Sequence, residues 1–349
     1  MKYIKPRAAI AALIALSLFA ALLSGCTNDN ASSSNSPTNN APGLTPIKVS
    51  EFRNMSWIAG YIAEAKGFYE EEGLAVEYVM YSDGPLAFQG MHSGDSDFCL
   101  LSQEPVLKAQ EEGLQSNIIY TVLDTRLYGF VGNAHVKEVS DLKGATIFAG
   151  MQGSAPYSFV CSILREAGID PEKDVTFVNM DYGASMAALD QGQIQASYIN
   201  NDNRVEMQDL DVNILVDTAE KADAKKYLDA DVFPGEIITT TKAFAENNPE
   251  TVQKFVNAIS KATEWMNESS SEEIAEALAP YFEGIEKEVL TKKVEIFKPA
   301  LTKTGYIDEA SEQAVIQFVV NGGTIEGTTP YDDIINMAFV DAYQALKVD

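Results

Sequence analysis

The sequence predicts an α/β protein with two domains, and three observations support this prediction. From Ile47 to Lys242, short apolar runs with strand spacing alternate with helical patterns, which favours α/β layers with mostly parallel sheets. The chain has 349 residues, whereas a single hydrophobic core stops growing at about 250–300 residues. Its 46% hydrophobic and 22% charged residues are typical of a globular protein.

The N-terminal residues have the pattern of a signal peptide. A basic segment, 1–7, precedes an apolar run, 8–23, which is shorter than the roughly 20 residues that cross a bilayer. The run ends in Leu23-Ser24-Gly25-Cys26, which resembles the lipobox of bacterial lipoproteins, in which the cysteine is lipidated and becomes the new N-terminus. We therefore expect a signal peptide at 1–25 and lipidation of Cys26. The alternative is an ordinary cleavage site with an incidental cysteine.

A polar segment, 26–45, follows and is rich in asparagine, serine and threonine. Such a segment buries little apolar surface, so we expect a flexible tether with a reach of roughly 25 Å. No later segment is apolar over enough residues to span a membrane. The folded part is therefore expected on the extracytoplasmic face of the cell membrane, held there by the lipid anchor only.

The first part of the folded region is expected to alternate strands and helices. Strands are predicted at 47–52, 74–81, 98–101 and 117–123, and helices at 57–66, from 82 or 83 onward, and at 104–110. Ser56 is a candidate cap of the first helix. Ser82 or Asp83 is a candidate cap of the second helix, which has Pro85 in its first turn.

The same alternation continues in the middle of the chain and then gives way to helices. Strands are predicted at 145–149, 175–180, 196–200 and 212–216, and helices at 155–167 and 184–190. After Lys242 the chain is mainly helical, and Asn248 is the expected cap of a helix that begins at Pro249. That helix carries one apolar stripe, formed by Val252, Phe255, Val256, Ile259, Ala262 and Met266.

The charge and the rare residue types exclude several classes of function. With 25 Lys+Arg and 51 Asp+Glu, the formal net charge is −26, and a polyanion repels nucleic acids and anionic lipid surfaces. Two histidines and three cysteines leave little material for a zinc site or a disulfide framework. We expect no metal and no cofactor.

Four segments resemble a known family. They are AEAKGFYEEEGLAVE at 63–77, SGDSDF at 93–98, VSDLKGATI at 139–147 and NNPETVQKF at 247–255. In this order they are similar to the substrate-binding proteins of ABC importers of the nitrate/taurine type, also described as SsuA/THI5-like or NMT1-like. The resemblance covers most of the chain from about Ile47 to Met266.

The resemblance implies the type II periplasmic-binding-protein fold, in which two crossovers join two α/β lobes and the ligand binds in the cleft between the lobes. We place the crossovers near 130–134 and 233–237, which gives lobe one at 46–130 plus 237–349 and lobe two at 131–236. The implied function is capture of a small molecule outside the membrane. A monomer would close on its ligand and deliver it to an ABC permease and the ATPase of that permease.

The ligand site is expected at the carboxyl ends of the strands, where open α/β sheets bind ligands. The loops at these ends offer amides, hydroxyls and aromatic rings, and a helix that starts after Gly153 offers free backbone N–H groups. The candidate ligand-binding residues are Trp57, Tyr81, Ser82, Gln103, Glu104, Gln152, Gly153, Ser154, Tyr157, Tyr182, Asn200 and Asn201. Plain helix capping and core packing remain the alternative for each of them.

The strand-end loops also suggest a ligand class. They contain no arginine or lysine but do contain Asp83, Glu104, Asp181 and Asp202, as well as several aromatic rings. This favours a neutral or cationic aromatic or heterocyclic ligand, pyrimidine-like in character. The alternative is a sulfonate of the taurine type or another organic anion, for which Arg126 is the candidate cation. A surface ligand sensor is the alternative of a different class.

Two other patterns are weaker. The oxygens between Asp209 and Glu220 have part of a calcium-loop spacing, but Ile214 stands where the sharp turn needs glycine. Ser185 lies in a motif one residue away from a nucleophile elbow, and the chain offers only His92 and His135 as bases. Neither pattern favours a calcium site or a hydrolase.

The cysteines also argue against an enzyme and against a disulfide. The yeast pyrimidine synthases that share this fold carry a cysteine-rich iron-site motif, and the sequence has no such cluster. Cys99 and Cys161 fall in different expected lobes, where a disulfide would prevent closure. We expect both to be free, buried thiols.

Overall fold

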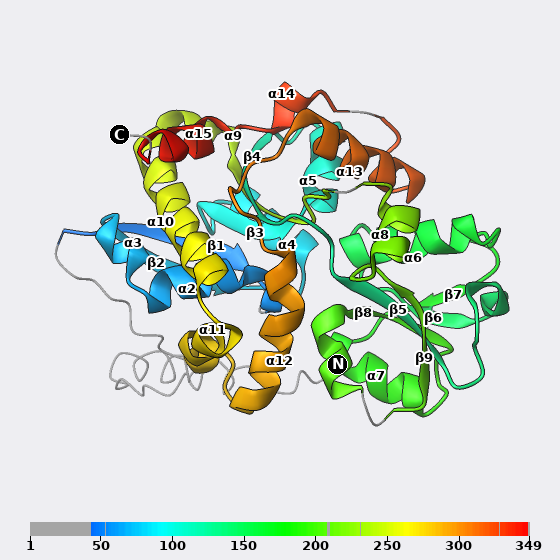
Figure 1. Ribbon diagram of the computed structural model, residues 1–349. Coiled ribbons are helices and arrows are strands. Elements are labelled where there is room, and N and C mark those ends of the chain that lie inside the picture. The colour runs from blue at the N-terminus through cyan, green and yellow to red at the C-terminus, as the bar shows by residue number, and fades with distance from the viewer. Residues whose placement is uncertain (1–42, 53, 208–209, 231, 328, 348–349) are drawn as a thin grey trace, which may run out of the picture. The chain divides into compact units, whose positions relative to one another are not determined.

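The computed structural model describes residues 43–52, 54–207, 210–230, 232–327 and 329–347 (Figure 1). These residues belong to one compact unit, so the division at 46–130 plus 237–349 and 131–236 stays a prediction. The predicted signal peptide at 1–25, Cys26, most of the tether and Asp209 lie outside the described residues. Within the described ranges, the helices are all too short or too polar to cross a bilayer.

The first sheet has five strands in the order β2-β1-β3-β10-β4. Their bounds are Thr45–Glu51 (β1), Leu74–Met80 (β2), Phe98–Ser102 (β3), Ser116–Leu123 (β4) and Glu236–Thr241 (β10). Strand β1 runs parallel to β2 and β3, whereas β10 runs antiparallel to β3 and β4. We call the part of the chain built on this sheet the first lobe.

The second sheet has five strands in the order β7-β6-β8-β5-β9, and it forms the second lobe. Their bounds are Tyr128–Asn133 (β5), Thr146–Phe148 (β6), Thr176–Val178 (β7), Ala196–Asn200 (β8) and Val212–Asp217 (β9). Strand β6 runs parallel to β7 and β8, whereas β5 runs antiparallel to β8 and β9. Both sheets are therefore mixed rather than purely parallel.

The antiparallel strands are the ones that follow the two crossovers. The chain leaves the first sheet after Leu123 and enters the second at Tyr128, and it returns to the first sheet at Glu236. Because the chain arrives from the other lobe, each of these strands begins at the sheet edge that faces that lobe. Tyr128 pairs with Asn200 and Glu236 pairs with Ser102, so both first residues lie beside the carboxyl ends of neighbouring strands.

Helices cover both sheets (Figure 1). In the first part they are η1 (Met55–Trp57), α2 (Ile58–Ala65), α3 (Phe68–Glu71), α4 (Gly84–His92) and α5 (Gln103–Glu111). In the middle they are η2 (Val139–Leu142), α6 (Ala155–Glu166), α7 (Tyr182–Asp190), η3 (Asn201–Glu206) and α8 (Lys221–Leu228). The last part contains α9 (Lys242–Asn247), α10 (Pro249–Glu268), α11 (Ser271–Leu278), η4 (Ala279–Tyr281), α12 (Lys287–Phe297), η5 (Lys298–Ala300), α13 (Glu309–Asn321), α14 (Tyr331–Ile334) and α15 (Ala338–Ala345).

The observed caps follow the expected chemistry with two corrections. Asp83 caps α4 by accepting the Leu86 N–H over 3.0 Å. The prediction that Ser56 caps the first helix is wrong, because Asn54 Oδ1 accepts the Ser56 N–H over 2.7 Å and the chain is already helical at Met55. Asn248 precedes α10 without a side-chain capping bond.

One large hydrophobic cluster includes residues of both sheets, and a second, smaller cluster lies in the second lobe. The predicted apolar stripe of α10 is confirmed, since Val252, Phe255, Val256, Ile259, Ala262 and Met266 are all fully buried. Cys99 in β3 and Cys161 in α6 are free and buried, as predicted. Burial raises the pKa of both thiols, so neither is a reactive thiolate.

Candidate functional site

A cavity of about 540 Å³ lies where the edges of the two sheets face one another. This volume is within the range of small-molecule sites, which is roughly 300–1,000 Å³. Asn54 follows β1, Ser82 follows β2, Ser102 ends β3 and Asn200 ends β8, and all four line the cavity. The predicted position at the carboxyl ends of strands therefore agrees with the cavity.

One wall of the cavity is aromatic. The rings of Tyr128 and Tyr198 meet edge-on with centroids 4.9 Å apart, and Tyr182 meets Tyr198 in the same way at 5.8 Å. The Phe148 ring packs edge-on against the Tyr182 ring, with centroids 5.2 Å apart. Tyr182 is 37% exposed, so its ring offers a face on which a flat ligand can stack. Burial raises the pKa of all three phenols, which keeps them neutral.

Polar groups are fixed around this wall. The Tyr198 hydroxyl donates to Asn200 Oδ1, which leaves the amide N–H groups of Asn200 to serve a ligand. Ser154 caps α6 by accepting the Tyr157 N–H over 3.5 Å and also lines the cavity. Asp83 places a carboxylate at the cavity while it caps α4.

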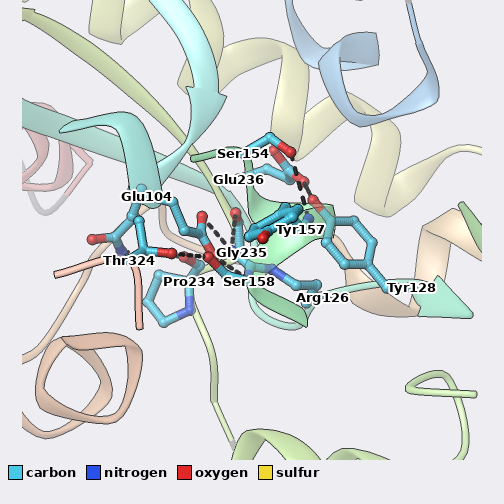
Figure 2. Close-up of polar contacts among 11 residues, drawn as sticks. Glu104, Arg126, Tyr128, Ser154, Tyr157, Ser158, Pro234, Gly235, Glu236 and Thr324 are labelled. Carbon is cyan, nitrogen blue, oxygen red and sulfur yellow. Dashed lines mark hydrogen bonds and ion pairs between the residues drawn. The ribbon is translucent and has the colours of Figure 1, made fainter. Parts of the chain in front are cut away.

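Glu236 adds a second carboxyl group at the point where the chain returns to the first lobe. It is 4% exposed and lines the cavity, and the Tyr128 hydroxyl donates to its Oε1 over 3.1 Å (Figure 2). Burial raises the pKa of Glu236 to about 8. The charge of Glu104 adds to this effect, whereas Arg126 and Tyr128 oppose it. At neutral pH this carboxyl group is therefore mostly protonated.

Arg126 does not reach the cavity. Its side chain is fully buried, and its two terminal nitrogens bind the Glu104 carboxylate over 2.5 and 3.1 Å (Figure 2). Arg126 Nη2 also donates to the carbonyl of Gly235 over 3.3 Å. The expected roles of Arg126 as an anion contact and of Glu104 as a ligand contact do not fit this geometry, because the two side chains satisfy each other beside the crossovers.

Lys293 on α12 is the basic side chain that lines the cavity in the part of the chain that the structure describes. Its Nζ lies 3.0 Å from Asp202 Oδ2 and 2.9 Å from Glu206 Oε1, and it donates to Asn203 Oδ1 over 3.3 Å. Burial alone would lower the pKa of Lys293, but the two carboxylates raise it. Because α12 belongs to the first lobe and η3 to the second, this cluster joins the lobes across the cavity.

The structure brings five of the twelve candidate residues to the cavity. These are Tyr81, Ser82, Ser154, Tyr182 and Asn200.

The other seven candidates lie elsewhere. Trp57 is buried against Phe52, with ring centroids 5.6 Å apart, and Tyr157 packs on Phe177. Gln103 donates to the carbonyl of Pro234 over 3.2 Å, and Asn201 donates to Asp217 over 2.7 Å. Glu104 is paired with Arg126, while Gln152 and Gly153 are in the turn before α6 and outside the cavity lining.

The calcium and hydrolase patterns receive no support from the described geometry. Val212–Asp217 is a strand rather than a loop, and the described residues contain no cluster of three possible metal ligands. The Ser185 hydroxyl donates to the carbonyl of Tyr182 over 2.8 Å. His92 bonds to Ser116 in the first lobe and cannot serve Ser185 as a base.

A family model described as NMT1/THI5 like matches residues 54–273 of this chain. Three bacterial proteins are similar along the sequence. YtlA, an inferred binding protein of Bacillus subtilis, is 24% identical and covers 87% of this chain and 91% of its own length. An inferred aliphatic sulfonates-binding protein of the same organism is 25% identical, over 94% of this chain and 95% of its own length. The riboflavin-binding protein RibY of Chloroflexus aurantiacus is 28% identical, over 61% of this chain and 59% of its own length.

Solved structures show the same architecture. A Bordetella bronchiseptica protein superimposes with a TM-score of 0.77 at 22% identity, covering 87% of this chain and 98% of its own. The alkanesulfonate-binding protein SsuA from Xanthomonas axonopodis, bound to MOPS, superimposes with a TM-score of 0.68 at 16% identity, over 85% of this chain and 99% of its own. The predicted two-lobed periplasmic-binding-protein fold is confirmed.

An enzyme is also similar along the sequence. A 4-amino-5-hydroxymethyl-2-methylpyrimidine phosphate synthase of Saccharomyces cerevisiae is 24% identical over 218 residues, which is 59% of this chain and 62% of that protein. The relatives therefore include proteins named for sulfonates, for a flavin and for a pyrimidine.

Proposed function

Because the chain belongs to the NMT1/THI5-like family, we propose that it is an extracytoplasmic solute-binding protein that captures a neutral or cationic flat heterocycle for an ABC importer. A permease and its ATPase are the partners that such a role requires. The protein binds its ligand without transforming it and acts as a monomer.

The chemistry of the cavity supports this ligand class. Tyr128, Tyr182 and Tyr198 form an aromatic wall, and Asp83 and Glu236 place carboxyl groups around it. Aromatic faces stack on flat rings, and carboxyl groups bond to ring N–H and amino groups. The cavity cation, Lys293, is already paired with two carboxylates, so it leaves little positive potential for an anion.

Lobe closure is the proposed mechanism. Tyr81 and Asp83 come from the first lobe, whereas Tyr182 and Asn200 come from the second, and all of them line one cavity. A ligand that touches both lobes binds the closed form more tightly than the open form. It therefore shifts the equilibrium toward closure by that difference in affinity.

A sulfonate or another organic anion is the second candidate, and Lys293 is the observation that favours it. A ligand anion that replaced Glu206 next to the Lys293 ammonium would keep that charge compensated. Relatives named for sulfonates agree with this alternative.

A thermal-shift screen of the fragment from Asn28 to Asp349 tests the proposal. The screen contains aminopyrimidines, flavins, aromatic amines, taurine, alkanesulfonates and nitrate. A ligand at 100 times its dissociation constant stabilises the folded state by about 2.7 kcal/mol, which such a screen detects. Stabilisation by sulfonates alone would favour the second candidate, and no stabilisation by any class would contradict a binding role.

The proposal includes the lipid anchor. Lipidation of Cys26 would hold the protein on the outer face of the membrane, where its ligand arrives. The tether would then let the binding lobes reach a permease in the same membrane.

A further inference from the structure

Glu236 lies where the cavity meets both crossovers. It is the first residue of β10 and comes directly after the return crossover. Its partner Tyr128 is the first residue of β5 and comes directly after the outward crossover (Figure 2). A ligand that contacts Glu236 therefore touches the point at which the lobes are joined.

The neighbouring cation is already engaged. Arg126 binds both oxygens of Glu104 and the carbonyl of Gly235, and the rings of Phe233 and Phe318 flank its guanidinium at 4.9 and 5.5 Å. One guanidinium compensates one carboxylate. A second ionised carboxyl group in the same buried region would lack a counter-ion, which is costly.

Asp83 at the start of α4 presents a further carboxyl group to the cavity, and it acts on Tyr182 together with Glu236. The other groups next to Glu236 are neutral. They are the phenols of Tyr128 on β5, Tyr182 on α7 and Tyr198 on β8, and the pKa of each is raised by burial. Arg126 and Glu104 are the charged groups that act on it. The pKa of Glu236 is raised to about 8, so this carboxyl group changes its charge near neutral pH.

Resting on the proposed function, we infer that Glu236 selects a flat nitrogen cation by giving up its own proton when the ligand binds. In the empty cavity the carboxyl group is protonated. A ligand with an N–C–N edge, such as an amidinium or a protonated aminopyrimidine, donates two hydrogen bonds to the carboxylate. The O–H bond of Glu236 breaks, the proton passes to solvent, and the ligand cation replaces it as the compensating charge.

Calorimetry with three related probes tests this inference on the fragment from Asn28 to Asp349. Benzamidine is a cation between pH 6 and 8, benzamide is its neutral analogue, and benzenesulfonate is an anion. Titration in buffers of different ionisation enthalpy should show release of about one proton per benzamidinium at pH 6.5. The benzamidinium dissociation constant should fall about tenfold from pH 6 to pH 7 and level off above about pH 8. Benzamide should bind without proton exchange and independently of pH.

Three variants locate the effect. Glu236→Gln keeps the shape of the protonated acid but cannot lose a proton, so the proton release and the pH dependence of benzamidinium binding should both vanish. Tyr128→Phe removes the hydroxyl that favours the carboxylate, so the pH at which affinity levels off should move upward. Glu312→Gln is the matched control, because Glu312 is 1% exposed and lies outside the cavity lining. It should leave the proton count unchanged, and thermal unfolding should confirm that each variant is folded.

Benzamidinium binding without proton release, or proton release that persists in Glu236→Gln, would overturn the inference. If benzenesulfonate binds and benzamidinium does not, the inference fails and the binding role stands. If neither these probes nor the wider screen yields a ligand, both the inference and the proposed function fail.

Discussion

Glu312 and Gln103 bring acceptor atoms together inside the first lobe. Both oxygens of Glu312 and Oε1 of Gln103 are buried without a hydrogen-bond partner among the described residues, and Gln103 is the polar neighbour of Glu312. Burial raises the pKa of Glu312 to about 7, against an opposing contribution from the Gln103 side chain, so this buried acid is protonated below that pH.

Glu312→Gln should therefore stabilise the protein increasingly as the pH rises. The folded pKa of about 7 lies above the ordinary value of 4.5, so wild type loses stability as the pH rises through this window. The loss from one group approaches about 1.4 kcal/mol per pH unit, and glutamine does not suffer it. Urea unfolding of both proteins at pH 5 and pH 7 measures the change, and an equal difference at the two pH values would contradict it.

The position of Trp57 indicates a role in core packing rather than in ligand binding. Its ring is fully buried beside Phe52 and outside the cavity lining. Trp57→Ala should lower the free energy of unfolding by about 3–5 kcal/mol through the cavity that it leaves, while the remaining folded protein binds ligand normally. The control is Trp265→Ala on α10, whose half-buried ring should cost less. A loss of ligand affinity with unchanged stability would contradict this prediction and indicate that Trp57 contacts the ligand.

At the scale of elements, the run of strands and helices and the position of the cavity could be predicted from the sequence. The rule used was that ligands lie at the carboxyl ends of parallel strands. It found Ser82 and Asn200, but it could not find Tyr128 and Glu236, because β5 and β10 run antiparallel and present their first residues at that edge. Strand direction depends on pairing across long sequence distances, which periodicity does not reveal.

For other residues, the sequence did not reveal whether they line the cavity, and the reason is different. Lys293 lies on a late helix with an ordinary amphipathic pattern, and nothing in that pattern indicates that the helix faces the second lobe. Conversely, Gln103 and Glu104 follow a strand as the rule requires, yet they turn toward the crossovers and bind Pro234 and Arg126. Their chemistry was visible in the sequence, but their partners were not.

The pairing of Lys293 with η3 should hold the lobes together without ligand. Lys293→Met would leave the buried Asp202 carboxylate without its counter-charge, and breaking a buried pair in this way costs about 3–5 kcal/mol. The loss of the Glu206 contact should add little, because solvent screens that exposed carboxylate. We expect a lower unfolding temperature and a larger radius of gyration by small-angle scattering. Asp202→Asn added to Lys293→Met should restore part of the stability.

Lys292→Met is the control for this prediction. Lys292 is the adjacent residue and pairs with Glu288 on the exposed face of the same helix, where an ion pair contributes about 0–1 kcal/mol. An equal change in unfolding temperature and radius of gyration for both substitutions would contradict the prediction that the Lys293 contacts hold the lobes together.

For the molecule as a whole, anchoring and binding should be separable. Cys26→Ser should release the protein from the membrane without changing its ligand affinity, because the cavity residues all lie between Phe52 and Lys293, well apart from Cys26 in the sequence. Membrane fractionation and calorimetry of the released protein measure the two properties. A variant that stays fully bound to the membrane would contradict the lipid anchor.

The place of β10 in the first sheet governs the order in which the chain can fold. β10 is the last strand in sequence, yet it lies between β3 and β4 and is the only strand that links them in the described sheet. The second sheet is complete at Asp217, so that lobe can form while the rest of the chain is still being synthesised. The first lobe must wait for Glu236–Thr241, and until then β3 and β4 expose unpaired edges that invite aggregation. A recombinant fragment that stops before Glu236 would thus contain every strand of the second sheet but would lack the central strand of the first.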